Sequence, residues 1–227
     1  MIYEGKNKSP VSEYWLHGKV LVVVKDELPN NVSLSSVLRF VEKRIPYHLF
    51  YDLDSVYIGQ FEEFIERDIN AFYRDGGIFV TNDQIDNQDL LDDIVHEIAH
   101  SVEELHDRHI YEDRTVESEF LGKRRRLYHI LRQQELDIDL NSDIIKKMFL
   151  DLKYSSKFDN ILYRDIGYPL LSSVSAGLFT GPYSITSLRE YFATGFEEYY
   201  IKDKKYLSKL CPSLYKKIDT LNNMSEE

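Results

Sequence analysis

Residues 87–105 read NQDLLDDIVHEIAHSVEEL and carry the strongest structural signal in the chain. Their apolar residues recur at steps of three and four: Leu90, Leu91, Ile94, Val95, Ile98, Ala99, Val102 and Leu105. This period predicts one amphipathic helix with a continuous apolar face that packs against a core. Asp86 or Asn87 can cap its start, and carboxylates in the first turn suit the positive end of the helix dipole.

The predicted helix contains the motif His96-Glu97-Ile98-Ala99-His100. Two histidines four residues apart project from one face of a helix, close enough to bind one metal ion. Glu97 lies about 100° around the helix from His96, where its carboxylate can reach a water held by that metal. Zinc bound by imidazoles lowers the pKa of such a water toward ~7, and the carboxylate can accept its proton. The motif therefore favours a hydrolytic zinc site over a surface helix that carries two histidines by chance.

Such a site needs a third protein ligand, and two residues are candidates. His106 stands at the spacing of the third histidine in HExxHxxGxxH, but Glu103 occupies the glycine position at which that pattern turns the chain. On an unbroken helix His106 would lie roughly 80° around and about 15 Å along the axis from His96, too far to share a metal. The other candidate is Glu190, on a helix expected over Ser187–Tyr200, where it could also be an ordinary charged position on a core helix.

The first third of the chain is expected to mix strands and helices. Lys19–Lys25 and Val56–Gly59 have the length and composition of strands. Asp75-Gly76-Gly77 separates two further apolar segments, which is a strong hairpin signal. A helix is expected from about Ser33 to just before Pro46.

The remainder of the chain is expected to be mainly helical. After Tyr111 helical patterns continue to about Tyr154, and Asn160–Ser184 is broken by glycine and proline into an irregular connection. A last helix is expected over Tyr206–Leu221, interrupted near Pro212. Strands first and helices second indicate the α+β class, with a small N-terminal mixed-sheet lobe and a mainly helical C-terminal lobe.

Composition excludes several classes of protein. The 227 residues include 28 Lys and Arg against 39 Asp and Glu, a net charge of −11, and one cysteine. One cysteine excludes a disulfide framework and a thiolate zinc cluster, so imidazoles and carboxylates are the remaining metal ligands. The acidic balance disfavours nucleic acid as a partner, and no apolar run is long enough for a membrane span. The start, MIYEGKNKSP, lacks the order of a signal peptide, so a cytoplasmic location is expected, with export by another route left open.

The motif and its surroundings resemble a known family. HEIAH preceded by the hairpin at Gly76-Gly77 is similar to the gluzincin metallopeptidases. Glu190-Tyr-Phe-Ala-x-x-Phe196 resembles the third-ligand segment of the anthrax lethal factor and Pro-Pro endopeptidase family. In that family a tyrosine lies seven residues before the glutamate ligand, and Tyr183 stands at this position here. The resemblance covers about a third of the chain, roughly Ala71–Leu105 and Tyr183–Ile218.

The resemblance implies a zinc-dependent endopeptidase that acts on a protein or peptide. His96, His100 and Glu190 would bind Zn²⁺, Glu97 would be the general base and acid, and Tyr183 would stabilise the oxyanion. The implied fold is a single zincin-like catalytic domain over 1–227. Its parts are an N-terminal lobe (1–110), a helical insertion (111–165) and a helical C-terminal lobe (166–227). Ile78–Thr81 would form the cleft edge that pairs with an extended peptide.

Two features depart from the family pattern. The stretch between His100 and Glu190 is longer than usual, and the extra segment is expected to cap the site or select the substrate. Thr194 stands where the family has an acidic residue that orients a ligand histidine, a task for which Glu197 is an alternative. A zincin-fold binding protein without catalysis, or a zinc hydrolase with His106 as third ligand, therefore remains an alternative function.

Two residues or runs outside the motif have simpler interpretations. Lys123-Arg124-Arg125-Arg126 is a basic run within a helical segment, and we expect it to be a solvated face paired with nearby glutamates. Cys211 beside Pro212 has no matching catalytic dyad in the sequence, so we expect it to be structural.

Overall fold

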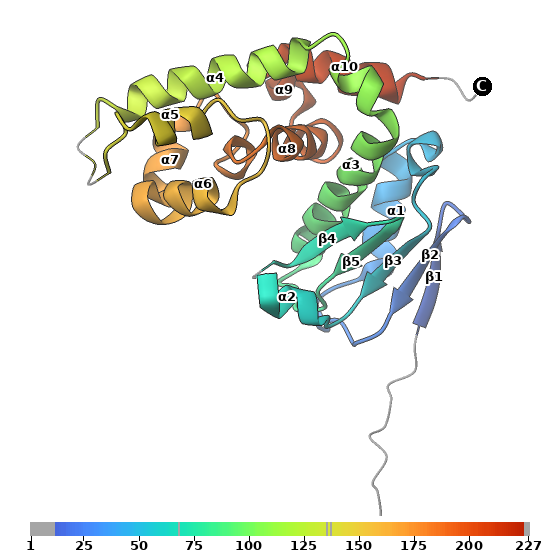
Figure 1. Cartoon of the computed structure of the whole chain (residues 1–227). Coiled ribbons are helices and arrows are strands. Elements are labelled where there is room, and N and C mark those ends of the chain that lie inside the picture. Colours follow the sequence, from blue (N-terminus) through green and yellow to red (C-terminus); the bar gives the residue numbers. More distant parts are fainter. Residues whose placement is uncertain (1–11, 68, 135, 137, 225–227) are drawn as a thin grey trace, which may run out of the picture. The chain divides into compact units, whose positions relative to one another are not determined.

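The computed structural model describes residues 12–67, 69–134, 136 and 138–224. Within them lie a mixed five-stranded sheet and a mostly helical remainder (Figure 1), so the α+β class is confirmed. The chain divides into two compact units, Met1–Val102 and Glu103–Glu227. None of the described helices is long and apolar enough to span a membrane. The prediction that the chain lacks a signal peptide depends on its first ten residues, which lie outside the described residues. The helical insertion expected at 111–165 stays a prediction.

The first unit is built on a sheet with strand order β1-β2-β3-β5-β4 (Figure 1). The strands are β1 (Ser12–Leu16), β2 (Val20–Val24), β3 (Ser55–Ile58), β4 (Ala71–Arg74) and β5 (Gly77–Val80). The strands β2, β3 and β5 run parallel, whereas β1 pairs antiparallel with β2 and β4 antiparallel with β5. Strand β1 is not predicted from the sequence, because only Leu16 of its residues is buried and no apolar alternation marks it.

The two faces of the sheet are covered differently. Along the parallel strands, fully buried residues alternate with less buried ones: the fully buried residues are Val20, Val22, Val56, Ile58, Ile78 and Val80. The helices α1 (Leu34–Arg44) and α3 (Asn87–Tyr111) lie on one side of the sheet in Figure 1 and bury an apolar face of their own. On the alternate positions, the rings of Tyr57 and Phe72 stack on Phe79 at centroid distances of 5.2 and 4.7 Å. The unit also contains η1 (Tyr47–Phe50) and α2 (Glu62–Arg67).

The strands β4 and β5 form the hairpin predicted around Asp75-Gly76-Gly77. Asp75 and Gly76 have φ values of 49° and 77°, the positive values that a two-residue type I′ turn requires. This hairpin places β4 at the end of the sheet, because β5 pairs with β3 on one side and with β4 on the other. The prediction that Ile78–Thr81 forms the peptide-binding edge is therefore wrong. A strand added at this end of the sheet would pair with β4.

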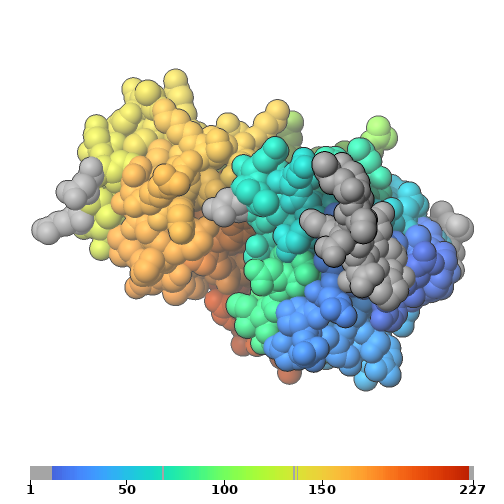
Figure 2. Space-filling view, turned by 90° about the horizontal axis from the view of Figure 1, so that it is seen from below, coloured from blue at the N-terminus to red at the C-terminus, as the bar shows by residue number. Residues whose placement is uncertain are grey.

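The second unit contains helices and no strand among its described residues. They are the end of α3, then α4 (Thr115–Leu131), α5 (Asp143–Met148), α6 (Ser156–Asn160), η2 (Ile161–Gly167), α7 (Tyr168–Ser175), η3 (Tyr183–Ile185), α8 (Leu188–Tyr200), α9 (Lys204–Leu210) and α10 (Pro212–Asn222). The predicted helix from Ser187 and the interruption at Pro212 are confirmed. The segments from α5 to α7, yellow and orange in Figure 2, form part of the surface.

The irregular connection predicted for Asn160–Ser184 is wrong over its first half. The chain is helical as far as Ser175, through the seven-residue π-helix η2 and then α7. Gly167 has a φ of 85° at the junction of these two helices, and Pro169 lies in the first turn of α7. A proline in the first turn has no partner to lose for its missing N–H. Glycine and proline therefore mark a junction between helices here and not an unstructured segment.

Helix α8 is the core helix of the second unit, and nearly all of its residues are buried. Gly195 lies on the side of α8 that meets α10. A Cβ at this position would overlap Cδ2 of Leu214 and lie 3.0 Å from its Cγ. The glycine therefore permits a close approach of the two helices. Gly122, on α4, has no such neighbour, because a Cβ there would have nothing within 4 Å.

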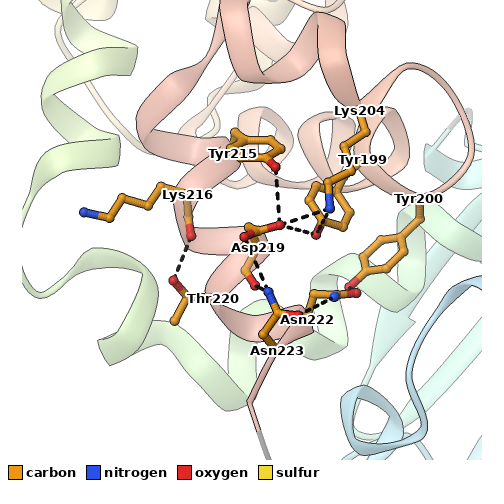
Figure 3. A network of polar contacts seen from close by, with 9 residues as sticks. All are labelled: Tyr199, Tyr200, Lys204, Tyr215, Lys216, Asp219, Thr220, Asn222 and Asn223. Carbon is orange, nitrogen blue, oxygen red and sulfur yellow. Dashed lines mark hydrogen bonds and ion pairs between the residues drawn. The ribbon is translucent and has the colours of Figure 1, made fainter.

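A polar network around Asp219 joins α8, α9 and α10 (Figure 3). Oδ1 of Asp219 accepts hydrogen bonds from the hydroxyl of Tyr199 at 2.7 Å and from Nζ of Lys204 at 3.0 Å. Nζ of Lys204 also lies 4.0 Å from the centroid of the Tyr199 ring. The hydrogen bonds from Tyr199 and Lys204 lower the pKa of Asp219 below its usual value. The ionised carboxylate therefore stabilises the contact between the three helices.

The basic run Lys123–Arg126 is not the solvated face that the sequence predicted. Arg125 and Arg126 are exposed, but Lys123 is 9% exposed and Arg124 is fully buried. The ammonium of Lys123 donates to the carbonyls of Leu178 and Leu210, each at 2.6 Å. It also lies 3.3 Å from Sγ of Cys211. The prediction failed because the helix turns successive residues by about 100°, so four adjacent basic residues cannot share one face.

Substitution of the two helical glycines should give opposite effects. Gly195→Ala should lower the free energy of unfolding by about 1–3 kcal/mol, because the new methyl group would displace the buried side chain of Leu214 between α8 and α10. Gly122→Ala should raise it by up to about 1 kcal/mol, because alanine favours the helix and restricts the unfolded chain. Urea denaturation followed by circular dichroism measures both. Equal effects of the two substitutions would contradict the close approach at Gly195.

Asp219→Asn should destabilise the chain in a pH-dependent manner. The loss at pH 7 should be roughly 1 kcal/mol, because the network is partly exposed to solvent. Since the pKa of Asp219 is lower in the folded state, its charge stabilises fully above about pH 4 and less as the pH falls through the folded pKa. The difference in unfolding free energy between wild type and variant should therefore shrink below about pH 4. A difference that is independent of pH would show that the network does not depend on the charge.

Candidate metal centre

Helix α3 is capped by Asp86, one of the two residues expected at its start. Oδ1 of Asp86 accepts hydrogen bonds from the amides of Gln88 at 2.8 Å and Asp89 at 3.0 Å. The side chain of Asn87 accepts instead from the amide of Ser33 at 2.6 Å and so joins the start of α3 to the start of α1. These contacts fix where α3 begins and therefore where its later turns lie.

The histidine pair of the motif lies in the middle of α3. Val95, Ile98 and Ala99 beside it are fully buried and hold this part of the helix against the core of the first unit. The rings of His96 and His100 have centroids 4.9 Å apart and planes at 86°. His96 is half-buried and His100 is 5% exposed. The helix therefore presents two neighbouring imidazoles on one face, as the four-residue spacing predicts.

Glu97 is 6% exposed, and a partly buried hydrogen bond supports the helix one turn before it. Nε2 of Gln84 donates to Oδ2 of Asp93 at 2.9 Å and to the carbonyl of Thr81, just after β5, at 3.0 Å. Burial raises the pKa of Asp93 to about 6, against the lowering effect of the bond from Gln84, while Asp89 and Glu97 add to the rise. Gln84 is not predicted from the sequence, because no periodicity or motif marks it. The contact joins the motif helix to the end of a strand.

Glu190 lies in the first turn of α8. The residues Ser187-Leu-Arg-Glu190 match the capping-box pattern, and Oγ of Ser187 accepts the amide of Glu190 at 3.1 Å. Tyr191 and Phe192, which follow directly, are fully buried and hold the start of the helix in the core of the second unit. Glu190 itself is 7% exposed. The local sequence therefore fixes the backbone from which this carboxylate projects.

His96, His100 and Glu190 form a group that could hold a metal ion. Each residue offers one ligand atom, and these atoms all lie within 4.8 Å of one another. Two imidazole nitrogens and one carboxylate oxygen are a donor set that zinc accepts in catalytic sites, where a fourth position is left for water. The residues present therefore fit a metal of this kind. No second group of three such side chains is found in the part of the chain that the structure describes.

The other candidate ligand, His106, is not a member of this group. Helix α3 continues through Glu103, and its backbone first departs from helical values at His106 itself, with φ −112° and ψ 21°. The kink therefore comes too late to turn His106 back toward His100. This matches the argument from the sequence, in which an unbroken helix carries His106 away from the motif.

Tyr183 and Thr194, the two remaining predicted positions, lie before and within α8. Tyr183 begins η3, and its side chain is 41% exposed. Oγ1 of Thr194 donates to the carbonyl of Glu190 at 2.9 Å and accepts from the hydroxyl of Thr180 at 3.1 Å. Glu197, the alternative to Thr194, forms an ion pair with Lys202 at 2.6 Å. The hydroxyl of Thr194 thus bonds within its own unit, and the catalytic role of Tyr183 stays a prediction.

Comparisons of the chain with protein families, with curated proteins and with solved structures find no match. The interpretation of the site therefore depends on its own residues and their geometry. The resemblance to gluzincins stays a prediction.

Removal of either kind of ligand should strongly weaken metal binding. With Zn²⁺ as the probe, metal-free protein should bind about one ion per chain, as expected for a site of three protein ligands. His100→Ala and Glu190→Ala should each weaken binding by more than about 100-fold, beyond the effect of losing a group that merely supports a ligand. His106→Ala is the control and should bind as the wild type does. Competition with a chromophoric chelator measures these affinities; weak binding by His106→Ala with normal binding by Glu190→Ala would exclude this ligand set.

Proposed function

We propose that the chain is a zinc-dependent endopeptidase of the gluzincin type. The observation that carries the proposal is the group His96, His100 and Glu190, with ligand atoms within 4.8 Å of one another and with Glu97 beside the first histidine. Two histidines and a glutamate are the protein ligands of several zinc peptidases. The order of elements also supports the proposal, because a sheet hairpin precedes the motif helix and a later helix carries the glutamate.

The residues of this chain have separate tasks in the proposed reaction. Zinc, when bound, would acidify a coordinated water and polarise the carbonyl of the scissile peptide bond. Glu97 would accept a proton from the attacking water on its carboxylate and return it to the leaving amine nitrogen. Tyr183 would donate a hydrogen bond from its hydroxyl to the developing oxyanion. The substrate class that follows is a protein or peptide.

A second candidate is a zincin-fold protein that binds a partner without cleaving it. Thr194 favours this alternative, because the gluzincin family that the chain resembles has an acidic residue at this position. The hydroxyl of Thr194 forms hydrogen bonds with Thr180 and with the carbonyl of Glu190 in its own helix. Loss of a carboxylate that orients a ligand histidine typically costs 10–100-fold in metal affinity or activity, an effect of about 1.4–2.7 kcal/mol. Substitution of Glu97 separates the two candidates. It lowers the cleavage rate of a weakened peptidase, and it changes nothing in a protein that binds without cleaving.

Glu97→Gln should retain zinc and lose cleavage. General-base catalysis contributes about 10²–10⁴-fold to the rate, so kcat should fall by a factor in this range while zinc affinity stays near the wild-type value.

Tyr183→Phe should also retain zinc and lower kcat by about 10²–10³-fold, with a smaller change in KM, because the hydroxyl acts on the transition state. Cleavage of a peptide library, read by mass spectrometry, provides the assay and the sequence preference.

The wild type loaded with zinc is the reference for these variants. Cleavage by Glu97→Gln at the rate of the wild type would come from a contaminating protease or from another mechanism, and would contradict the proposed role. A wild type that binds zinc but cleaves no peptide, with no effect of Glu97→Gln, would favour the binding protein.

A further inference from the structure

Arg124 is a fully buried cation in the middle of α4. Its guanidinium carbon lies 4.5 Å from the ring centroid of Phe120 and 4.7 Å from that of Phe158. Burial lowers the pKa of Arg124 to about 9, while Asp151 opposes this shift. Burial of a charge is costly unless hydrogen bonds compensate it, so the partners of Arg124 show which segments it holds.

The hydrogen bonds of the Arg124 guanidinium go to backbone carbonyls of two separate segments. Nη1 donates to Met148 O at 3.2 Å and to Asp151 O at 2.5 Å, at the end of α5 and in the loop that follows. Nε donates to Ile185 O at 2.8 Å, and Nη2 donates to Ile185 O and, at 2.7 Å, to Thr186 O. The planar guanidinium thus joins the α5–α6 loop to the turn between η3 and α8.

The turn held by Arg124 lies between two residues of the proposed site. Tyr183 stands at its start and Glu190 just after its end. Local bonds shape the turn, because Oγ1 of Thr186 donates to the carbonyl of Tyr183 at 2.8 Å and Oγ of Ser187 caps the amide of Glu190. These local bonds do not attach the turn to the rest of the unit. Arg124 supplies such an attachment, together with the bond from the amide of Leu188 to Leu152 O at 2.9 Å.

We propose that Arg124 is a positioning residue for the metal site: it holds the turn from Tyr183 to Glu190 in place before a metal binds. The inference rests on the proposed function in that Glu190 is taken as a zinc ligand. A preordered turn presents the Glu190 carboxylate in one orientation, so that less conformational freedom is lost on binding. Arginine suits this position because its planar fork offers five donors, whereas lysine offers three from one point and cannot span both segments.

Lys123 provides a matched control on the same helix. It is almost as buried as Arg124 and also donates to backbone carbonyls, at Leu178 and Leu210. Neither carbonyl belongs to the turn between Tyr183 and Glu190. Lys123→Met therefore removes a buried cation of the same unit without releasing this turn.

The test compares Arg124→Lys, Arg124→Met and Lys123→Met with the wild type as full chains. Zn²⁺ affinity is measured by chelator competition at a temperature where circular dichroism shows each variant to be folded. Amide hydrogen exchange over residues 183–190 is measured in metal-free protein. Both Arg124 variants should bind Zn²⁺ about 10–100-fold more weakly and exchange faster in this segment. Lys123→Met should lose thermal stability but keep Zn²⁺ affinity within about twofold of the wild type.

Three results would overturn the inference. The first is wild-type Zn²⁺ affinity in Arg124→Lys, and the second is an equal loss of affinity in Lys123→Met, which would indicate general loosening. The third is fast exchange of the amides of Ile185 and Thr186 in metal-free wild type, a measurement that needs no variant to fold. If the wild type itself binds no Zn²⁺, the proposed function fails, whereas the exchange experiment still decides whether Arg124 orders the turn.

Discussion

The helical period of α3 is the constraint on which the candidate site depends. One face of the helix is apolar and fully buried at Ile94, Val95 and Ile98, so the rotation of the helix about its axis is set by packing. Once this rotation is set, His96 and His100 must lie one turn apart on a common face. The cap at Asp86 fixes the start of the helix, and the bond from Gln84 to Asp93 joins it to the end of β5. The same 25-residue helix therefore supplies core packing and two of the three side chains of the candidate metal centre.

Buried polar groups, besides the apolar core, connect the segments of the second unit. Lys123 and Arg124 bring two cations into the interior, where they bind main-chain carbonyls of segments that are separate in the sequence. Such groups are costly to leave unpaired, so they favour one arrangement of the segments around them. The segment 111–165, expected to select the substrate, thus also contributes to the inside of its own unit. Its deletion would remove Arg124 together with any surface that recognises a peptide.

Much of the fold could be predicted from local patterns, because those patterns reflect burial on one face. The hairpin at Asp75-Gly76 and the helix from Ser187 each carry their own turn or cap chemistry. The strands that were placed wrongly or missed share a cause, which is pairing with a second segment that their own residues do not reveal. Strand β1 is defined by its pairing with β2 and not by its own pattern, and β5 is internal because β4 occupies the end of the sheet. The position of a strand within a sheet is not encoded in the strand alone.

The candidate site likewise has a part that local sequence predicts and a part that depends on tertiary contacts. The sequence by itself determined the histidine pair and its neighbour Glu97, because a spacing of four residues on a helix is a local property. It also left two candidates, His106 and Glu190, for the third position. Only the tertiary structure brings the ligand atoms of Glu190 and the two histidines within 4.8 Å, and only the structure shows that α3 carries His106 onward to a late kink. The physical reason is that the distance between residues 100 and 190 depends on how the intervening helices pack, and buried contacts such as those of Arg124 take part in that packing without any signal in the local sequence.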